Sequence, residues 1–187
     1  MSQFSVGSSA GGGSPTTLIS RQTASNQSAI TFTSGINSSY AYYKLIITGA
    51  QFVLNGSDTL RLRFSTNGGS SYDSGTNYSY NEQYYSSDNN QDWNRANGQT
   101  SIFLAFPLPS SATSTDNGCY EINLYSLSSS SLFKEVRCLG SSVVTATNTI
   151  INAGGSYNIA TAVNAFQLFN SSGGNIFAGT FSLYGVA

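Results

Sequence analysis

The side chains that most often carry out acid–base or metal chemistry are scarce in this sequence. It has no histidine, and its 187 residues include eight acidic and seven basic side chains. Without histidine the chain lacks the commonest general base, the commonest metal ligand and the usual activator of a serine or cysteine nucleophile. The acids are scattered without a shared motif, so no pair can be nominated for two-carboxylate glycosidase chemistry. We therefore predict a protein that is not an enzyme, needs no cofactor and works by contact.

The two cysteines, Cys119 and Cys138, both fall in strand-like runs. A disulfide between them would require their Cβ atoms to lie close together, which adjacent antiparallel strands can provide. Synthesis in a cytoplasm instead favours free thiols. We expect free thiols, and the sequence leaves the bonded alternative open. Two cysteines without histidine or a nearby acid cluster do not make a zinc site.

The run Asp88–Asp92 offers several oxygen atoms at close spacing, and oxygen is the ligand that calcium prefers. The run lacks the glycine and the distal glutamate of an EF-hand loop. We predict no metal site, and a bound ion at this run stays an open alternative.

Aromatic side chains crowd a polar region between residues 72 and 95, where Tyr80, Tyr84, Tyr85 and Trp93 lie among Asn and Asp residues. Flat apolar rings with polar edges are what a sugar-binding or protein-binding surface needs. The alternative is a long inter-strand excursion whose rings turn inward. We nominate these four residues as the candidate interface, and we rank contact with a neighbouring subunit before a glycan site.

The segment Ser65–Tyr72 resembles the Asp-box of sialidase-like proteins, Ser-x-Asp-x-Gly-x-Thr-Trp. Asn67 stands for the Asp, Ser71 for the Thr and Tyr72 for the Trp. The expected role is structural, because such an Asn can bond back to its own backbone while the glycines supply positive φ.

Arg61 and Arg63 project from one face of a predicted strand. They can pair across strands with an acid such as Glu121 or Glu135, which is worth little at an exposed site. They can also dock onto an acidic partner, and the sequence does not separate these alternatives.

Composition sets the class of protein. Apolar residues make up 39% of the chain and the net charge is −1. The chain can therefore build a core, but it has no basic patch to neutralise a phosphate backbone, so we predict no nucleic-acid partner. No stretch approaches the roughly 20 apolar residues of a membrane helix, so we predict no membrane partner.

The hydrophobic pattern is that of strands. Leu60–Phe64 alternates, with the leucines and Phe64 on one face. Tyr42–Ile47 and Ile102–Leu108 are more continuously apolar, which is typical of strands covered on both faces. Turn signals fall between such runs, at Asn55-Gly56, Asn67-Gly-Gly69, Asn97-Gly98, Asn117-Gly118, Gly154-Gly155 and Gly173-Gly-Asn175.

We therefore predict an all-β fold: a two-sheet antiparallel β-sandwich of jelly-roll type with eight to ten strands. The expected exception is a helical turn between Ser87 and Arg95. Residues 16–187 are expected to form a single β-sandwich domain.

Residues 1–15 are rich in Gly and Ser and are predicted to form an extended N-terminal arm. They lack the basic start and the apolar run of a signal peptide, so we expect synthesis in a host cytoplasm. Phe4 and Val6 are the candidate docking residues of this arm.

Two stretches resemble a jelly-roll-like module of virion structural proteins of tailed bacteriophages. The first is Ile30-Thr-Phe-Thr-Ser-Gly-Ile, Tyr40-Ala-Tyr-Tyr-Lys-Leu-Ile-Ile and Leu60-Arg-Leu-Arg-Phe-Ser-Thr-Asn-Gly-Gly-Ser-Ser-Tyr72. The second is the C-terminal Asn164-Ala-Phe-Gln-Leu-Phe-Asn-Ser-Ser-Gly-Gly-Asn-Ile-Phe-Ala-Gly-Thr-Phe-Ser-Leu-Tyr-Gly185. The middle third of the chain is unmatched. The resemblance implies a virion component, often trimeric, and it carries no catalytic residues.

On that resemblance we expect a capsid decoration (cement) subunit, a homotrimer that binds the major capsid protein or other virion proteins. The alternative is a receptor- or glycan-binding module of a tail or head fibre, with a host glycan as partner. A polysaccharide-degrading enzyme ranks last, because it would require two carboxylates converging in a cleft.

Overall fold

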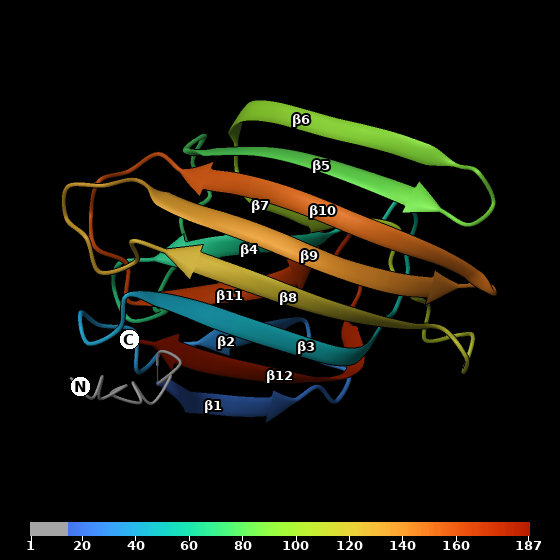
Figure 1. The fold of residues 1–187 in the computed structure, drawn as a ribbon, viewed down its shortest axis with the longest axis horizontal. Helices are drawn as coiled ribbons and strands as arrows, with labels where there is room; N and C mark the ends of the chain where they lie inside the picture. Colours follow the sequence, from blue (N-terminus) through green and yellow to red (C-terminus); the bar gives the residue numbers. More distant parts are fainter. Residues whose placement is uncertain (1–14) are drawn as a thin grey trace, which may run out of the picture.

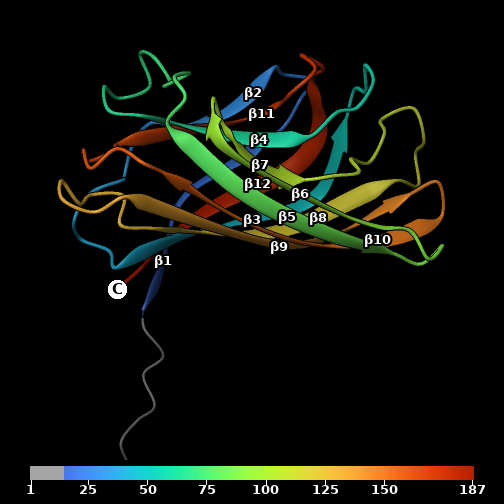
Figure 2. The ribbon, with the colours of Figure 1, turned by 90° about the horizontal axis from the view of Figure 1, so that it is seen from above.

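Two antiparallel β-sheets pack face to face in the computed structural model, which describes residues 15–187 (Figures 1 and 2). The larger sheet has eight strands in the order β1-β12-β3-β8-β9-β10-β5-β6, and the smaller has four in the order β2-β11-β4-β7. The strands are β1 (Thr16–Thr23), β2 (Ala29–Phe32), β3 (Tyr42–Phe52), β4 (Leu60–Ser65), β5 (Tyr78–Ser86), β6 (Gln91–Gln99), β7 (Ile102–Ala105), β8 (Asn117–Tyr125), β9 (Lys134–Val144), β10 (Thr147–Tyr157), β11 (Ala165–Asn170) and β12 (Ile176–Val186).

The strand pairing is nested in the manner of a jelly roll. β1 pairs with β12 and β3 with β8 in the large sheet, while β2 pairs with β11 and β4 with β7 in the small one. Early strands thus pair with late ones, alternately in the two sheets. The β9–β10 hairpin and the edge strand β6 extend the large sheet beyond this nested set. The predicted all-β sandwich is confirmed, with twelve strands within residues 15–187 instead of the expected eight to ten.

The core lies between the sheets and follows the alternation of the sequence. Leu60, Leu62 and Phe64 of β4 are buried, as the pattern predicted. β7 is buried on both faces, as expected for the apolar run that begins at Ile102. Tyr42–Ile47 differs from its prediction, because alternate side chains of β3 are only half-buried on the outer face of the large sheet. A long sheet with one solvated face gives this result.

Three of the predicted turn signals lie inside strands. Asn97-Gly98 falls in β6, Asn117-Gly118 in β8 and Gly154-Gly155 in the middle of β10. The other three lie between strands, as predicted. Glycine weakens a strand but is tolerated where a neighbour approaches closely or the ladder bulges. At Gly155 the approach is close, since an added Cβ would meet Ile102 Cγ2 at 2.6 Å. At Gly98 the φ of +63° accompanies a register shift in the β5–β6 ladder.

The predicted helical turn between Ser87 and Arg95 is wrong. Residues 87–90 form a tight connection between β5 and β6, and Gln91 onward is strand. β6 pairs only with β5 and is exposed on both faces for most of its length, so it carries no apolar alternation that a sequence pattern could detect. Within residues 15–187 no helix is long and apolar enough to cross a lipid bilayer.

Candidate functional site

The β5–β6 hairpin sorts the nominated aromatic residues onto two faces of the large sheet. Neighbouring side chains in a strand point to opposite faces. Tyr85 and Trp93 stand on the outer face, exposed by 53% and 64%. Tyr84 is buried on the inner face, where its ring meets Phe106 edge-on at 5.7 Å.

The four nominated residues are therefore not one surface, and the nomination of Tyr84 is wrong. Tyr80 is also partly withdrawn from solvent, with its ring packed edge-on against Phe103 at 5.4 Å. Tyr85 and Trp93 remain as the exposed pair. The sequence analysis predicted no strand between residues 72 and 95, so it had no strand alternation with which to separate the rings.

The guanidinium of Arg95 lies over the Trp93 ring, 4.9 Å from its centroid. Both side chains are on the outer face, two residues apart on β6, so the arginine supports the indole from one side. Beside Trp93 is a hollow of about 340 Å³ lined by Gln83, Tyr85, Gln91, Asp92 and Trp93. The hollow thus combines two aromatic rings with amide and carboxylate groups.

The register of the sheet places exposed aliphatic side chains next to these rings. Ile150 of β10 is directly opposite Tyr85, and Leu139 of β9 is opposite Asn152, which in turn is opposite Gln83. Ile150 and Leu139 are both exposed. Directly opposite residues share a face. The outer-face patch is defined here as Leu139, Ile150, Tyr85 and Trp93. Sequence reasoning missed the two aliphatic members, which only strand register brings to the aromatic ones.

Directly behind this surface is a buried acid that the sequence did not single out. Glu82 of β5 is fully buried on the inner face. Its Oε2 accepts a hydrogen bond from Asn94 Nδ2 at 3.3 Å, and its Oε1 has no partner. Burial raises the pKa of Glu82 to about 7, the Asn94 bond opposes this rise, and the nearby Asp92 carboxylate adds to it. Because its side chain points into the sandwich, Glu82 does not face the outer hollow.

The Asp-box-like segment is a turn with a structural role, as expected, and it lies in the connection that leads from β4 in the small sheet to β5 in the large one. Asn67 Oδ1 accepts hydrogen bonds from the Ser71 amide at 3.0 Å and the Ser65 hydroxyl at 2.8 Å. Gly68 and Gly69 have φ values of +71° and +85°. Every one of these contacts is internal to the turn.

Arg61 and Arg63 do not pair with Glu121 or Glu135. The Arg61 guanidinium lies over the rings of Tyr80 and Phe103, at 5.1 and 4.6 Å from their centroids. That of Arg63 lies 4.6 Å from the Phe169 centroid. Both arginines are on β4, in the sheet that does not contain the two acids, so the predicted cross-strand pairing is wrong.

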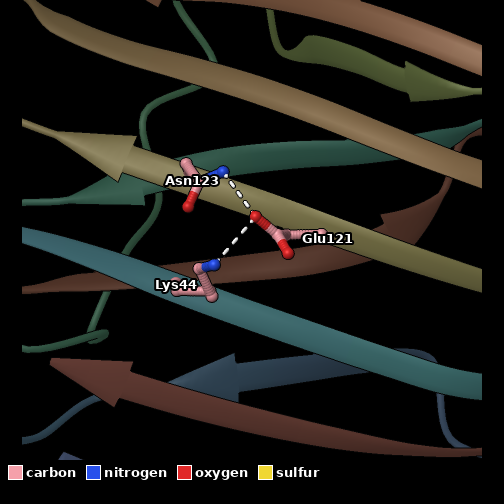
Figure 3. A network of polar contacts seen from close by, with 3 residues as sticks. All are labelled: Lys44, Glu121 and Asn123. Atoms are coloured by element: carbon pink, nitrogen blue, oxygen red, sulfur yellow. Dashed lines mark hydrogen bonds and ion pairs between the residues drawn. The ribbon is translucent and has the colours of Figure 1, made fainter. Parts of the chain in front are cut away.

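Glu121 instead belongs to a polar network on the outer face of the large sheet (Figure 3). Its Oε1 lies 3.0 Å from Lys44 Nζ on the neighbouring β3 and accepts a hydrogen bond of 3.0 Å from Asn123 Nδ2. These two contacts, the Asn123 bond first, hold the pKa of Glu121 below its usual range. Among the described residues this is the one ion pair within 4 Å.

Cys119 and Cys138 are free thiols, as expected. Cys119 is opposite Ser141 and Cys138 is opposite Ile122, so the two cysteines do not face each other in the β8–β9 ladder. Cys138 is buried and Cys119 is exposed. In residues 15–187 no three His, Cys, Asp or Glu side chains gather as a metal site, and this includes the run Asp88–Asp92.

The predicted docking residues Phe4 and Val6, and the arm of residues 1–15 apart from Pro15, lie outside the described residues. The chain enters the fold at Pro15, next to β1. β1 and β6 are the two opposite edges of the large sheet (Figure 1). The outer hollow and Pro15 thus lie at opposite edges of the large sheet.

The chain shows little similarity to known proteins. No protein-family model matches the chain, and no curated protein matches it significantly. Among solved structures it has a weak likeness to the CBM2 module of the evolved Dit of Lactobacillus casei BL23 phage J-1. The identity is 10%, the match covers 85% of this chain and 69% of that chain, and the TM-score is 0.24. A likeness at that score carries no argument about this chain.

Proposed function

We propose that this chain is a virion structural protein of a tailed phage that acts by binding, and that the outer face of the β5–β6 hairpin recognises a glycan. The motif resemblance at Ile30–Tyr72 and Asn164–Gly185 and the jelly-roll pairing support the virion role. They do not choose between decoration of a capsid and recognition of a receptor. The surface of the β5–β6 hairpin supports the receptor-binding role.

The observation that carries the glycan function is the position of Trp93. Its indole is exposed and held from one side by Arg95, and it borders a hollow that also contains Tyr85, Gln83 and Gln91. A sugar ring has an apolar C–H face and hydroxyl edges. Aromatic rings suit the face, and side-chain amides can donate to and accept from the hydroxyls.

The hollow also lies at the edge of the sheet opposite to the chain's entry at Pro15. A module attached to a particle through its N-terminal segment would therefore present Trp93 away from the attachment. This arrangement favours the receptor-binding alternative over the decoration role that the sequence ranked first.

Capsid decoration remains a second candidate because of Ile150 and Leu139. Exposed aliphatic side chains next to aromatic ones are typical of a protein–protein contact. Cryo-electron microscopy of the assembled particle separates the two candidates. Copies bound across the capsid lattice through the outer-face patch would support decoration and would contradict a free glycan site.

The test of glycan binding is an array experiment with three proteins. The wild-type chain should bind at least one glycan, and Trp93→Ala should abolish that binding. Phe133→Ala is the matched control, because Phe133 is also an exposed aromatic residue but lies in the β8–β9 connection. Equal binding by the wild type and Trp93→Ala, or no binding at all, would contradict the proposal.

We also propose that binding proceeds without hydrolysis. The hollow offers one carboxyl group, Asp92, whereas glycosidase chemistry requires two acids about 5–9.5 Å apart flanking the scissile bond. The nearby Glu82 is buried on the other side of the sheet. Release of reducing ends from a bound glycan would overturn this part of the proposal.

A further inference from the structure

We propose that the hollow at Trp93 continues into a glycine-floored groove on the outer face, and that the two form one extended site for a neutral oligosaccharide that lies along the β5–β6 hairpin. This inference rests on the proposed glycan function and names the kind of glycan. It predicts recognition of a chain of sugars instead of a single terminal sugar.

The floor of the groove is Gly154, in the middle of β10. Register places Gly154 between Arg137 of β9 and Asn81 of β5, and Asn81 is in turn opposite Arg95 of β6. These neighbours carry long or polar side chains on the outer face, and Gly154 carries none. The resulting trough has a volume of about 350 Å³, and its walls include Ser79, Asn97, Glu135 and Ser156.

The fold itself does not require a glycine at this position. A Cβ built at Gly154 would come no closer than 3.6 Å to another heavy atom, the Val136 carbonyl oxygen, which is an ordinary contact. The adjacent Gly155 is different, because its Cβ would clash with Ile102 in the core. Packing therefore explains why residue 155 is a glycine, but it does not explain the glycine at position 154. A groove that must stay open does explain Gly154.

Shared lining residues link the hollow to the groove. Asn81 and Arg95 border two further depressions along the hairpin, of which one shares Trp93 with the hollow and the other shares Asn97 with the groove. From Gln91 at one end to Asn97 at the other, β6 advances by about 20 Å at the usual rise per residue. A single sugar ring cannot span that distance, but an oligosaccharide of several sugars can.

The charges along the site indicate that the ligand is neutral. Arg95 and Arg137 contribute two positive charges, and Asp92 and Glu135 contribute two negative ones. An acidic chain would be repelled at Asp92 and Glu135, and a basic one at the arginines. The remaining polar side chains are amides and hydroxyls, which match sugar hydroxyl groups.

The experiment uses ladders of cello-, malto- and chito-oligosaccharides, from disaccharide to hexasaccharide, titrated calorimetrically into the wild type and two variants. Gly154→Val fills the groove with a residue that strands favour. Thr48→Val is the matched control, because Thr48 is an exposed outer-face residue on β3, away from the hairpin. Thermal unfolding of each variant checks that the fold is retained.

For the wild type, affinity should rise with chain length. Gly154→Val should bind the hexasaccharide about tenfold more weakly, a loss of about 1.4 kcal/mol, and should bind the disaccharide unchanged. Thr48→Val should match the wild type. If chain length has no effect, or Gly154→Val binds the hexasaccharide normally, the extended site is wrong while the hollow at Trp93 stands. If none of the ladders binds the wild type although the glycan array finds a ligand that requires Trp93, this inference is wrong and the proposed function stands.

Discussion

Glu82 on β5 and Asn94 on β6 are joined across the edge of the large sheet by a hydrogen bond of 3.3 Å, which is the sole partner of a fully buried carboxyl group. One carboxyl oxygen is left without a donor, and no cation that contacts it is found among residues 15–187. A buried group of this kind favours its neutral form.

We predict that the stability of the fold depends on the protonation of Glu82. Burial raises its pKa in the folded state to about 7, well above the value of an exposed glutamate. The folded state therefore binds more protons than the unfolded state between roughly pH 4.5 and 7, so stability falls as pH rises through that window. The contribution lost is on the order of 3 kcal/mol.

Chemical denaturation of the wild type and Glu82→Gln at a series of pH values measures this dependence. Glu82→Gln should be more stable than the wild type at pH 8, because its side chain stays neutral, and it should show a flatter profile from pH 5 to 7. Parallel profiles for the two proteins would show that Glu82 is not the group responsible.

A pair of adjacent glycines gives a second prediction. At Gly155 a Cβ would lie 2.6 Å from Ile102 Cγ2 and 2.7 Å from the Ser79 carbonyl oxygen, so Gly155→Ala forces the two sheets or two strands apart. It should reduce the free energy of unfolding by about 1–3 kcal/mol. Gly154→Ala, which meets only ordinary contacts, should change it by no more than about 0.5 kcal/mol. Urea titrations of both variants compare these values, and an equal effect at the two positions would contradict the difference in Cβ contacts.

The two cysteines should differ in reactivity. Cys138 is buried, and burial raises the pKa of its thiol, so little reactive thiolate forms near neutral pH. Cys119 is exposed on β8. Titration of the native protein with a disulfide reagent should modify one thiol quickly, and unfolding should release the second. Rapid reaction of both in the native state would require Cys138 to be accessible.

Arg95 should act as a positioning residue for Trp93. A cation over an indole ring contributes about 0.5–1 kcal/mol at an exposed site. Arg95→Ala should therefore shift the fluorescence of Trp93, the one tryptophan of the chain, and weaken glycan affinity by a few-fold without changing thermal stability much. Arg95→Lys should restore only part of the effect, because lysine lacks the planar guanidinium. An unchanged emission spectrum would mean that the two side chains are not in contact in solution.

Part of this fold follows from short-range pattern. The alternation of Leu60–Phe64 and the apolar run at Ile102 correctly predicted buried strands, and the strand-like pattern of the whole chain correctly predicted an all-β fold. These features are local, because a strand with one buried face must alternate and a strand buried on both faces must be apolar throughout. The turn at Asn67 is local in the same sense, since the hydrogen bonds of the Asn67 side chain join residues no more than four apart.

The candidate site could not be predicted from short-range sequence pattern. β6 is polar because it is an edge strand with little to cover, so its sequence looks like a loop or a helical turn, and only pairing with β5 reveals the strand. Once that pairing is known, Tyr84 goes to the core and Tyr85 to solvent. Composition led to the prediction that the chain works by contact more than by acid–base chemistry. Sheet register decided which side chains lie together on the outer face. Residues distant in sequence, such as Trp93, Ile150 and Gly154, share that face only through their positions in neighbouring strands.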